Sequence, residues 1–94
     1  MSARQEGDRQ QALLGTAIRE VRKSRGMTQK QLAQRTGIHV TYISDIERGA
    51  RNPSWDKIAT LAAGMSVPTA DIAARYDALS SSYHSSGADA HEES

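Results

Sequence analysis

The sequence predicts an all-α fold, and three observations support this fold class. Apolar residues recur at helical spacing along the chain, and no window alternates in the manner of a half-buried strand. Gly, Ser and Pro punctuate these periodic stretches at short intervals. The chain has 94 residues and a hydrophobic content of 37%, with no Phe, so its core must consist of small and aliphatic side chains. A single compact domain of five helices is therefore expected.

The first helix is predicted from apolar residues at i, i+3, i+4 and i+7 spacing. These residues are Leu13, Leu14, Ala17, Ile18 and Val21. Gly26 is expected to end this helix. The residues before it, 1–11, are polar and include Gly7, which predicts a flexible N-terminal arm.

The second and third helices are predicted to be short and to follow each other closely. Thr28 and Gln31 have the spacing of a capping box that begins the second helix. Gly37 ends that helix, because glycine readily adopts the positive φ of a tight turn. A third helix is expected over about residues 40–48. Neither helix is long enough to be stable without the rest of the domain.

Two further helices are predicted before a polar tail. Ser54 has the character of an N-cap, Asp56 suits the positive first turn that follows, and the inward residues of this fourth helix are Ile58, Leu61 and Ala62. A fifth helix is expected over about residues 69–79. Residues 80–94 are rich in Ser, with no periodic apolar residues and with acidic residues near the end, so a disordered tail is predicted.

Two short helices joined by a Gly-containing turn have the spacing of a helix-turn-helix. Ala33 is small enough to allow the two helices to approach closely. The apolar seam beneath them is predicted to be Leu32, Ile38, Ile43 and Ile46. The turn would let the third helix project outward, in the manner of a helix that enters a DNA major groove about 12 Å wide.

Several function classes are disfavoured by composition. The chain has no Cys, which excludes disulfides, thiolate zinc sites and cysteine nucleophiles. His39, His84 and His91 lack a metal-ligand spacing, and no nucleophile or phosphate-loop motif is present. Asp45 and Glu47 lie two apart on a helix and so face different ways. We therefore expect no enzymatic activity, no metal and no cofactor.

Charge is distributed unevenly along the chain. The net charge is only +1, yet residues 19–57 contain nine basic residues against four acidic ones. Such a segment could bind a polyanion, although a solvated charged surface is the commoner reason for such an excess. No apolar run approaches the ~20 residues of a membrane span, and the N-terminus does not have the character of a secretory signal. A cytoplasmic location is expected.

The sequence closely resembles those of one protein family. The segment "IREVRKSRGMTQKQLAQRTGIHVTYISDIERGARNPSWDKIATLA" is similar to the Cro/C1-type (XRE) helix-turn-helix proteins, over about residues 13–79. The combination of "TQKQLA", a glycine, "YISDIERG" and "NPS" is specific. "TYISDIERGARNPS" is also similar to the controller proteins of restriction–modification systems. The resemblance implies a phage-repressor (lambda repressor-like) five-helix fold, with residues 12–79 as the DNA-binding domain.

The resemblance also implies roles for individual residues. It places at DNA base edges His39, Val40, Thr41 and Asp45. It places at the DNA backbone or groove Gln29, Tyr42, Ser44, Arg48, Arg51 and Asn52, with Arg51 the best candidate for insertion into a groove. Tyr42 could instead pack on the first helix, and Asp45 could be an ordinary solvent-facing residue. Arg22 and Glu47 match a structural ion pair.

Assembly and partners are predicted from the apolar pattern of the sequence and from the same resemblance. An apolar stripe is expected to form a dimer interface through Val67, Ile72, Tyr76 and Leu79. Trp55 is expected to pack against the start of the fourth helix rather than to stack on a DNA base. The predicted function is a homodimeric, sequence-specific transcriptional regulator that binds a palindromic double-stranded DNA operator through residues 40–48. The alternative is an antitoxin-type module that uses the same fold to bind a partner protein.

Overall fold

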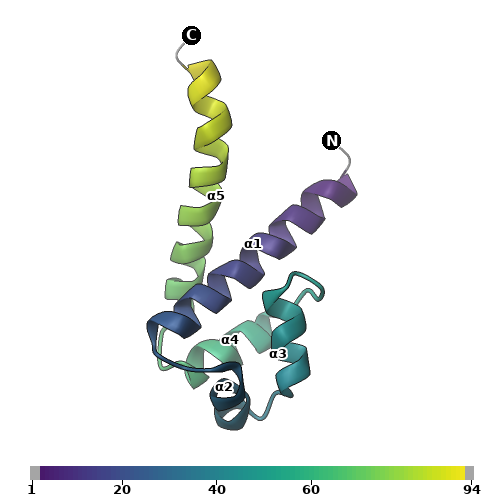
Figure 1. The fold of residues 1–94 in the computed structure, drawn as a ribbon, viewed down its shortest axis with the longest axis vertical. Helices are drawn as coiled ribbons and strands as arrows, with labels where there is room; N and C mark the ends of the chain where they lie inside the picture. The colour runs from purple at the N-terminus through teal and green to yellow at the C-terminus, as the bar shows by residue number, and fades with distance from the viewer. Residues whose placement is uncertain (1–2, 93–94) are drawn as a thin grey trace.

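The computed structural model describes residues 3–92, and in that range every regular element is a helix. The helices are α1 (Ala3–Ser24), α2 (Gln29–Thr36), α3 (Val40–Glu47), α4 (Trp55–Gly64) and α5 (Thr69–Glu92). The two long helices lie close together near the end of α1 and the start of α5 and diverge toward the chain termini, with the three short helices below them (Figure 1). The predicted all-α, five-helix fold is confirmed. None of the described helices combines the length and apolar character that crossing a membrane requires.

The two long helices extend further than the sequence pattern predicted. α1 begins at Ala3, within the expected arm, and α5 continues to Glu92, through the expected tail. Near its start, α1 is held by an ion pair of 3.0 Å between Arg9 Nη1 and Glu6 Oε1, and the Gln11 side chain donates to the Gly49 carbonyl at 2.8 Å. Apolar periodicity missed these turns because a solvated helix needs no apolar face. The division into arm, domain and tail stays a prediction.

The predicted helix caps are present at the ends of the short helices. The Gln31 backbone N–H donates to Thr28 Oγ1 at 3.0 Å, and the Thr28 N–H donates to Gln31 Oε1 at 2.9 Å, which completes the capping box. Gly37 has φ of 78°, in the left-handed region that favours glycine. The Ser54 hydroxyl caps α4 by accepting from the Lys57 N–H at 3.2 Å. Local sequence therefore sets the boundaries of α2 and α4.

One hydrophobic core lies at the junction of the five helices. Its largest fully buried side chains are Ile18, Leu32, Ile43, Ile46, Leu61, Met65 and Ile72. The predicted seam beneath the helix-turn-helix is confirmed, since all four of its residues are buried. Ile72 was predicted to lie in a dimer interface, and this was wrong, because its side chain is only 2% exposed and fills the core of its own chain.

Two glycines allow neighbouring helices to approach closely. A Cβ on Gly15 of α1 would overlap the carbonyl oxygen of Ile46 near the end of α3, and a Cβ on Gly64 of α4 would overlap the side chain of Thr36. The first of these contacts cannot relax by moving a flexible side chain, because the opposing atoms belong to backbone. α1 therefore sets the position of the C-terminal end of α3.

We predict that Gly15→Ala destabilises the protein by about 1–3 kcal/mol, the usual cost of inserting a carbon into a filled site. Gly7→Ala is the matched control on the same helix, because a Cβ there meets nothing within 4 Å. It is expected to stabilise the fold by about 0.5–1 kcal/mol, the helix-propensity advantage of Ala over Gly. Urea unfolding of both variants measures the difference. Equal effects of the two substitutions would show that Gly15 is not a contact point.

Candidate nucleic-acid interface

The first turn of α3 is exposed and carries three of the predicted base-reading residues. His39, Val40 and Thr41 are all exposed, while Ile43 and Ile46 on the opposite face are buried. His39 is the N-cap, and its Nδ1 accepts from the Thr41 N–H at 3.1 Å. In the neutral imidazole this leaves Nε2–H as the available donor. The fold thus presents an imidazole donor, an apolar side chain and a hydroxyl on one turn whose other face is fixed in the core.

Asp45, the fourth predicted base reader, lies in a different environment. Its Oδ1 accepts a hydrogen bond from Arg48 Nη2, and its Oδ2 lies 3.9 Å from Arg51 Nε. Two residues predicted to hold the DNA backbone are therefore paired with a residue predicted to read a base. In this arrangement each of the two carboxylate oxygens faces an arginine.

Tyr42 links the loop after α3 to the start of α4. Its half-buried side chain packs against the core, and the Arg51 guanidinium lies 4.7 Å from the ring centroid. Lys57 Nζ lies 5.6 Å from the same centroid. These are cation–π distances, so the ring holds two positive charges in place. Lys57 was missed by the sequence analysis, and the only signal for it was its place in the basic segment.

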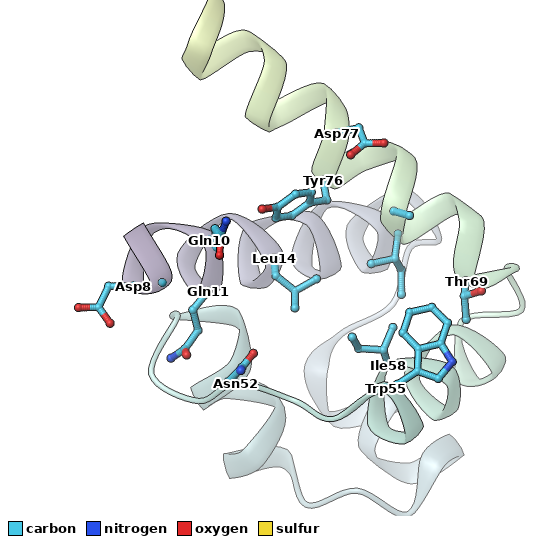
Figure 2. A pocket seen from close by; sticks show the side chains of 13 residues that line it. Asp8, Gln10, Gln11, Leu14, Asn52, Trp55, Ile58, Thr69, Tyr76 and Asp77 are labelled. Carbon is cyan, nitrogen blue, oxygen red and sulfur yellow. The ribbon is translucent and has the colours of Figure 1, made fainter. Parts of the chain in front are cut away.

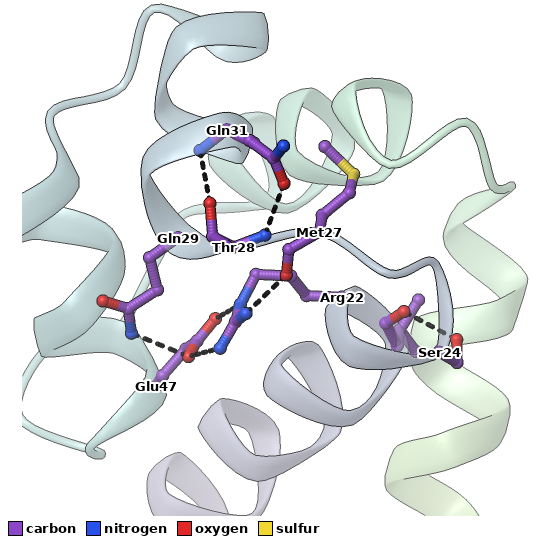
Figure 3. A network of polar contacts seen from close by, with 8 residues as sticks. Arg22, Ser24, Met27, Thr28, Gln29, Gln31 and Glu47 are labelled. Carbon is purple, nitrogen blue, oxygen red and sulfur yellow. Dashed lines mark hydrogen bonds and ion pairs between the residues drawn. The ribbon is translucent and has the colours of Figure 1, made fainter.

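Glu47 is the centre of a buried polar network near the base of α3 (Figure 3). It accepts from Arg22 in a two-bond arrangement, with Nε to Oε2 at 2.7 Å and Nη2 to Oε1 at 2.9 Å. Arg22 Nη1 also donates to the Met27 carbonyl at 2.7 Å. Both charged residues are buried, and no buried side-chain N or O atom among the described residues lacks a hydrogen-bond partner. The predicted ion pair is present and joins α1 to α3.

Gln29 belongs to this network. Its Nε2 donates to Glu47 Oε1 at 2.9 Å, so the amide group that was predicted to hold a phosphate is directed to a carboxylate instead. The N-terminal backbone of α2 remains beside it, with Thr28 as the cap. The other two predicted backbone contacts are Ser44, which is half-buried on α3, and Asn52, which is exposed in the loop before α4.

An apolar hollow of about 600 Å³ lies between α1, α4 and α5 (Figure 2). The apolar and aromatic side chains around it are Leu14, Trp55, Ile58, Ile72, Ala73 and Tyr76. Trp55, which was expected to pack against the start of α4, is 64% exposed and borders the hollow beside Ile58. The predicted interface stripe is also divided, because Tyr76 lines this hollow whereas Val67 lines another, beside Val21 and Arg25. Leu79 is half-buried on α5.

The structure offers no metal centre within the part of the chain it describes. No three His, Asp or Glu residues in that part lie together in a way that could hold an ion. The side chains of His84 and His91 fall outside the described ones. Three features of the described surface could bind a partner. They are the exposed turn of α3, the basic cluster around Tyr42 and the apolar hollow.

Comparison with known proteins identifies the family. A model of helix-turn-helix domains matches residues 18–72, which include α2, α3 and the Arg22–Glu47 pair. The chain belongs to the Cro/C1-type helix-turn-helix family. The control protein C.BamHI of Bacillus amyloliquefaciens is 43% identical over 61 residues, which are 64% of this chain and 75% of that protein.

Solved structures of related proteins have the same fold. The restriction–modification controller protein C.Esp1396I, solved as a tetramer in complex with its natural 35-base-pair operator, is 28% identical, with a TM-score of 0.67 over 71% of this chain and 88% of that one. The clp gene regulator ClgR of Corynebacterium glutamicum is 25% identical, with a TM-score of 0.74 over 88% of this chain and 87% of that one.

We predict that removing one partner of the Arg22–Glu47 pair costs about 3 kcal/mol or more of folding free energy, because the other charge stays buried without its counterion. Arg22→Met and Glu47→Gln keep most of the side-chain volume. The double variant is expected to recover part of the loss. Denaturant unfolding of the wild type, both single variants and the double variant measures the coupling. Additive losses would mean that the two side chains do not stabilise each other.

Proposed function

We propose that this protein is a dimeric, sequence-specific regulator of transcription that binds double-stranded operator DNA. The observation that carries the proposal is the exposed first turn of α3, fixed from behind by the core and flanked by a basic cluster. Membership of the Cro/C1-type family and the operator-bound relative support it. The proposal involves no catalytic step and places the protein in the cytoplasm, with the DNA that it regulates.

Sequence reading is assigned to the exposed turn. The Thr41 hydroxyl can hydrogen-bond a base edge, and Val40 can contact only an apolar group, for which the thymine methyl is the natural partner. His39 can donate through Nε2 to a base or a phosphate. Such contacts carry sequence information, because each base pair presents a different pattern in the major groove.

Backbone holding is assigned to the other end of α3 and to the loop after it. Arg48, Arg51 and Lys57 bring three positive charges to the neighbourhood of Tyr42 and Asp45. Phosphate contacts of this kind position a protein on the duplex and provide most of its non-specific affinity. The two ends of one short helix thus have different tasks.

Dimerisation is assigned to the apolar hollow. A single α3 covers too few base pairs for useful specificity, and family members of this type bind paired half-sites. Trp55 and Tyr76 border the hollow, and Ile58 and Leu14 line it (Figure 2). This proposed interface keeps Tyr76 from the stripe predicted from sequence and adds Trp55, Ile58 and Leu14, whereas Ile72 lies at the floor of the hollow with only 2% of its surface exposed. A large exposed aromatic beside an apolar hollow is typical of an interaction surface.

The same hollow is the observation that favours the second candidate, an antitoxin-type module. In that case a partner protein, rather than a second copy of this chain, would cover Trp55. Binding of operator DNA by a homodimer without any other protein separates the two functions.

We predict that Thr41→Ala and Arg51→Ala weaken DNA binding in different ways. Loss of the Thr41 hydroxyl is expected to cost about 1 kcal/mol on the preferred operator and to relax selection at one base pair in each half-site. Loss of Arg51 is expected to weaken operator and scrambled duplexes alike, and to reduce the slope of log K against log salt by about 1 per site. The operator is first identified by selection from random DNA. Salt titrations on this operator and on its scrambled duplex then measure these effects.

The wild-type protein provides the internal control for this pair of variants. Selected sequences are expected to contain two symmetric half-sites about 10 base pairs apart, or a small multiple of one helical turn. Equal binding of operator and scrambled DNA at 150 mM salt, with Thr41→Ala indistinguishable from wild type, would rule out base reading by α3.

We predict that Trp55→Ser raises the dimer dissociation constant by more than about tenfold, because an aromatic anchor at the centre of an interface usually contributes strongly. In a two-fold dimer the substitution acts on both sides of the interface. Val40→Ser is the matched control, since Val40 is the other large exposed apolar residue among those whose side chains the structure describes and lies on α3. It is expected to leave the dimer intact. Sedimentation equilibrium measures both, and a wild-type monomer at tens of micromolar, free and on DNA, would contradict the assignment.

A further inference from the structure

Asp45 joins the two arginines at the end of α3 into one cluster. Its two carboxylate oxygens have separate partners, Arg48 on Oδ1 and Arg51 on Oδ2, the latter at 3.9 Å. Of these three residues, Asp45 is the most enclosed: its side chain is 22% exposed, against 63% for Arg48 and 53% for Arg51. The carboxylate is therefore enclosed between two cations that remain largely open to solvent.

Tyr42 fixes the same cluster from a second direction. The Arg51 guanidinium lies over the ring at 4.7 Å from the centroid, while its Nε lies toward Asp45. A guanidinium that lies over a ring and has its Nε 3.9 Å from a carboxylate still has N–H groups along its edges that can donate. Lys57, also over the ring, adds a third cation to the group. The arrangement restrains where the arginines lie and leaves them donors for a phosphate.

We propose that Asp45 is a positioning residue that determines specificity, by restraining Arg48 and Arg51 to the arrangement that suits the operator backbone. This inference rests on the proposed function. It differs from base reading, because Asp45 then acts through the arginines and touches no base.

The restraint affects operator and random DNA differently. On the operator, base contacts from the first turn of α3 fix one register, and arginines that are already placed for that register lose little freedom on binding. On random DNA, affinity comes from phosphates alone, and the strongest contacts require each arginine to move to the nearest phosphate. That movement breaks the pairs with Asp45 and leaves its carboxylate beside the polyanion. Specificity is a difference of two affinities, so weakening the random complex raises it.

The inference is tested with Asp45→Asn, which keeps the shape of the side chain and removes its charge. Asp71→Asn is the matched control, because it removes one negative charge from an exposed residue on α5. Random-duplex affinity is expected to rise about two- to fivefold per protomer, the scale of an exposed ion pair. The salt slope on that duplex is expected to steepen by up to about 1. Operator affinity is expected to rise less, so the ratio of the two affinities falls by at least about twofold.

The arginines provide the second arm of the experiment. In an Arg48→Gln, Arg51→Gln background, Asp45→Asn is expected to change the affinity ratio no more than Asp71→Asn does, since Asp45 then has no cation to restrain. An undiminished effect in that background would overturn the inference. Thermal unfolding confirms that each variant is folded at the temperature of the titration.

The remaining outcomes are also decisive. The inference is wrong if Asp45→Asn behaves as Asp71→Asn does, or if it raises operator and random affinity by the same factor. A loss confined to the operator would instead make Asp45 a base reader. A wild-type protein that prefers no selected sequence would contradict the proposed function itself, and this result is seen before any variant is compared.

Discussion

The rest of the structure depends on the hydrogen bonds that the Glu47 carboxylate accepts. It accepts from Arg22 of α1 and from Gln29 of α2, and it stands at the end of α3, so one side chain joins three helices (Figure 3). α2 and α3 have eight residues each and would not be stable alone. The Gly15 backbone contact with the end of α3 adds a steric limit to this electrostatic one. With its C-terminal end held in this way, α3 can leave its first turn exposed without losing its orientation.

That constraint explains how eight residues serve several tasks. Ile43 and Ile46 bind α3 to the core, and Glu47 ties it to the network. The first turn therefore needs no stabilising contact beyond the His39 cap, which uses one ring nitrogen. Asp45 is directed sideways to the arginines. The exposed residues of the first turn and the residue that organises charge are consequently separated along one short helix.

Sequence predicted the features that depend on neighbouring residues or on a repeating pattern. The capping box, Gly37, the Ser54 cap and the buried seam follow from spacing along a few turns. The Arg22–Glu47 pair came from family resemblance. The failures concern contacts between distant segments. The Tyr42 cluster depends on how α3 and α4 approach, which no local pattern encodes. Ile72 faces the core of its own chain, and apolar character alone could not distinguish a core face from an interface.

The loop after α3 borders both the proposed DNA-facing surface and the hollow. It carries Arg51, while its Gly49 carbonyl accepts from Gln11 of α1, and a Cβ on Gly49 would lie 3.0 Å from the α1 backbone. Gln11 and Asn52 both line the hollow (Figure 2). A second protomer seated there would therefore press on the same few residues that place Arg51.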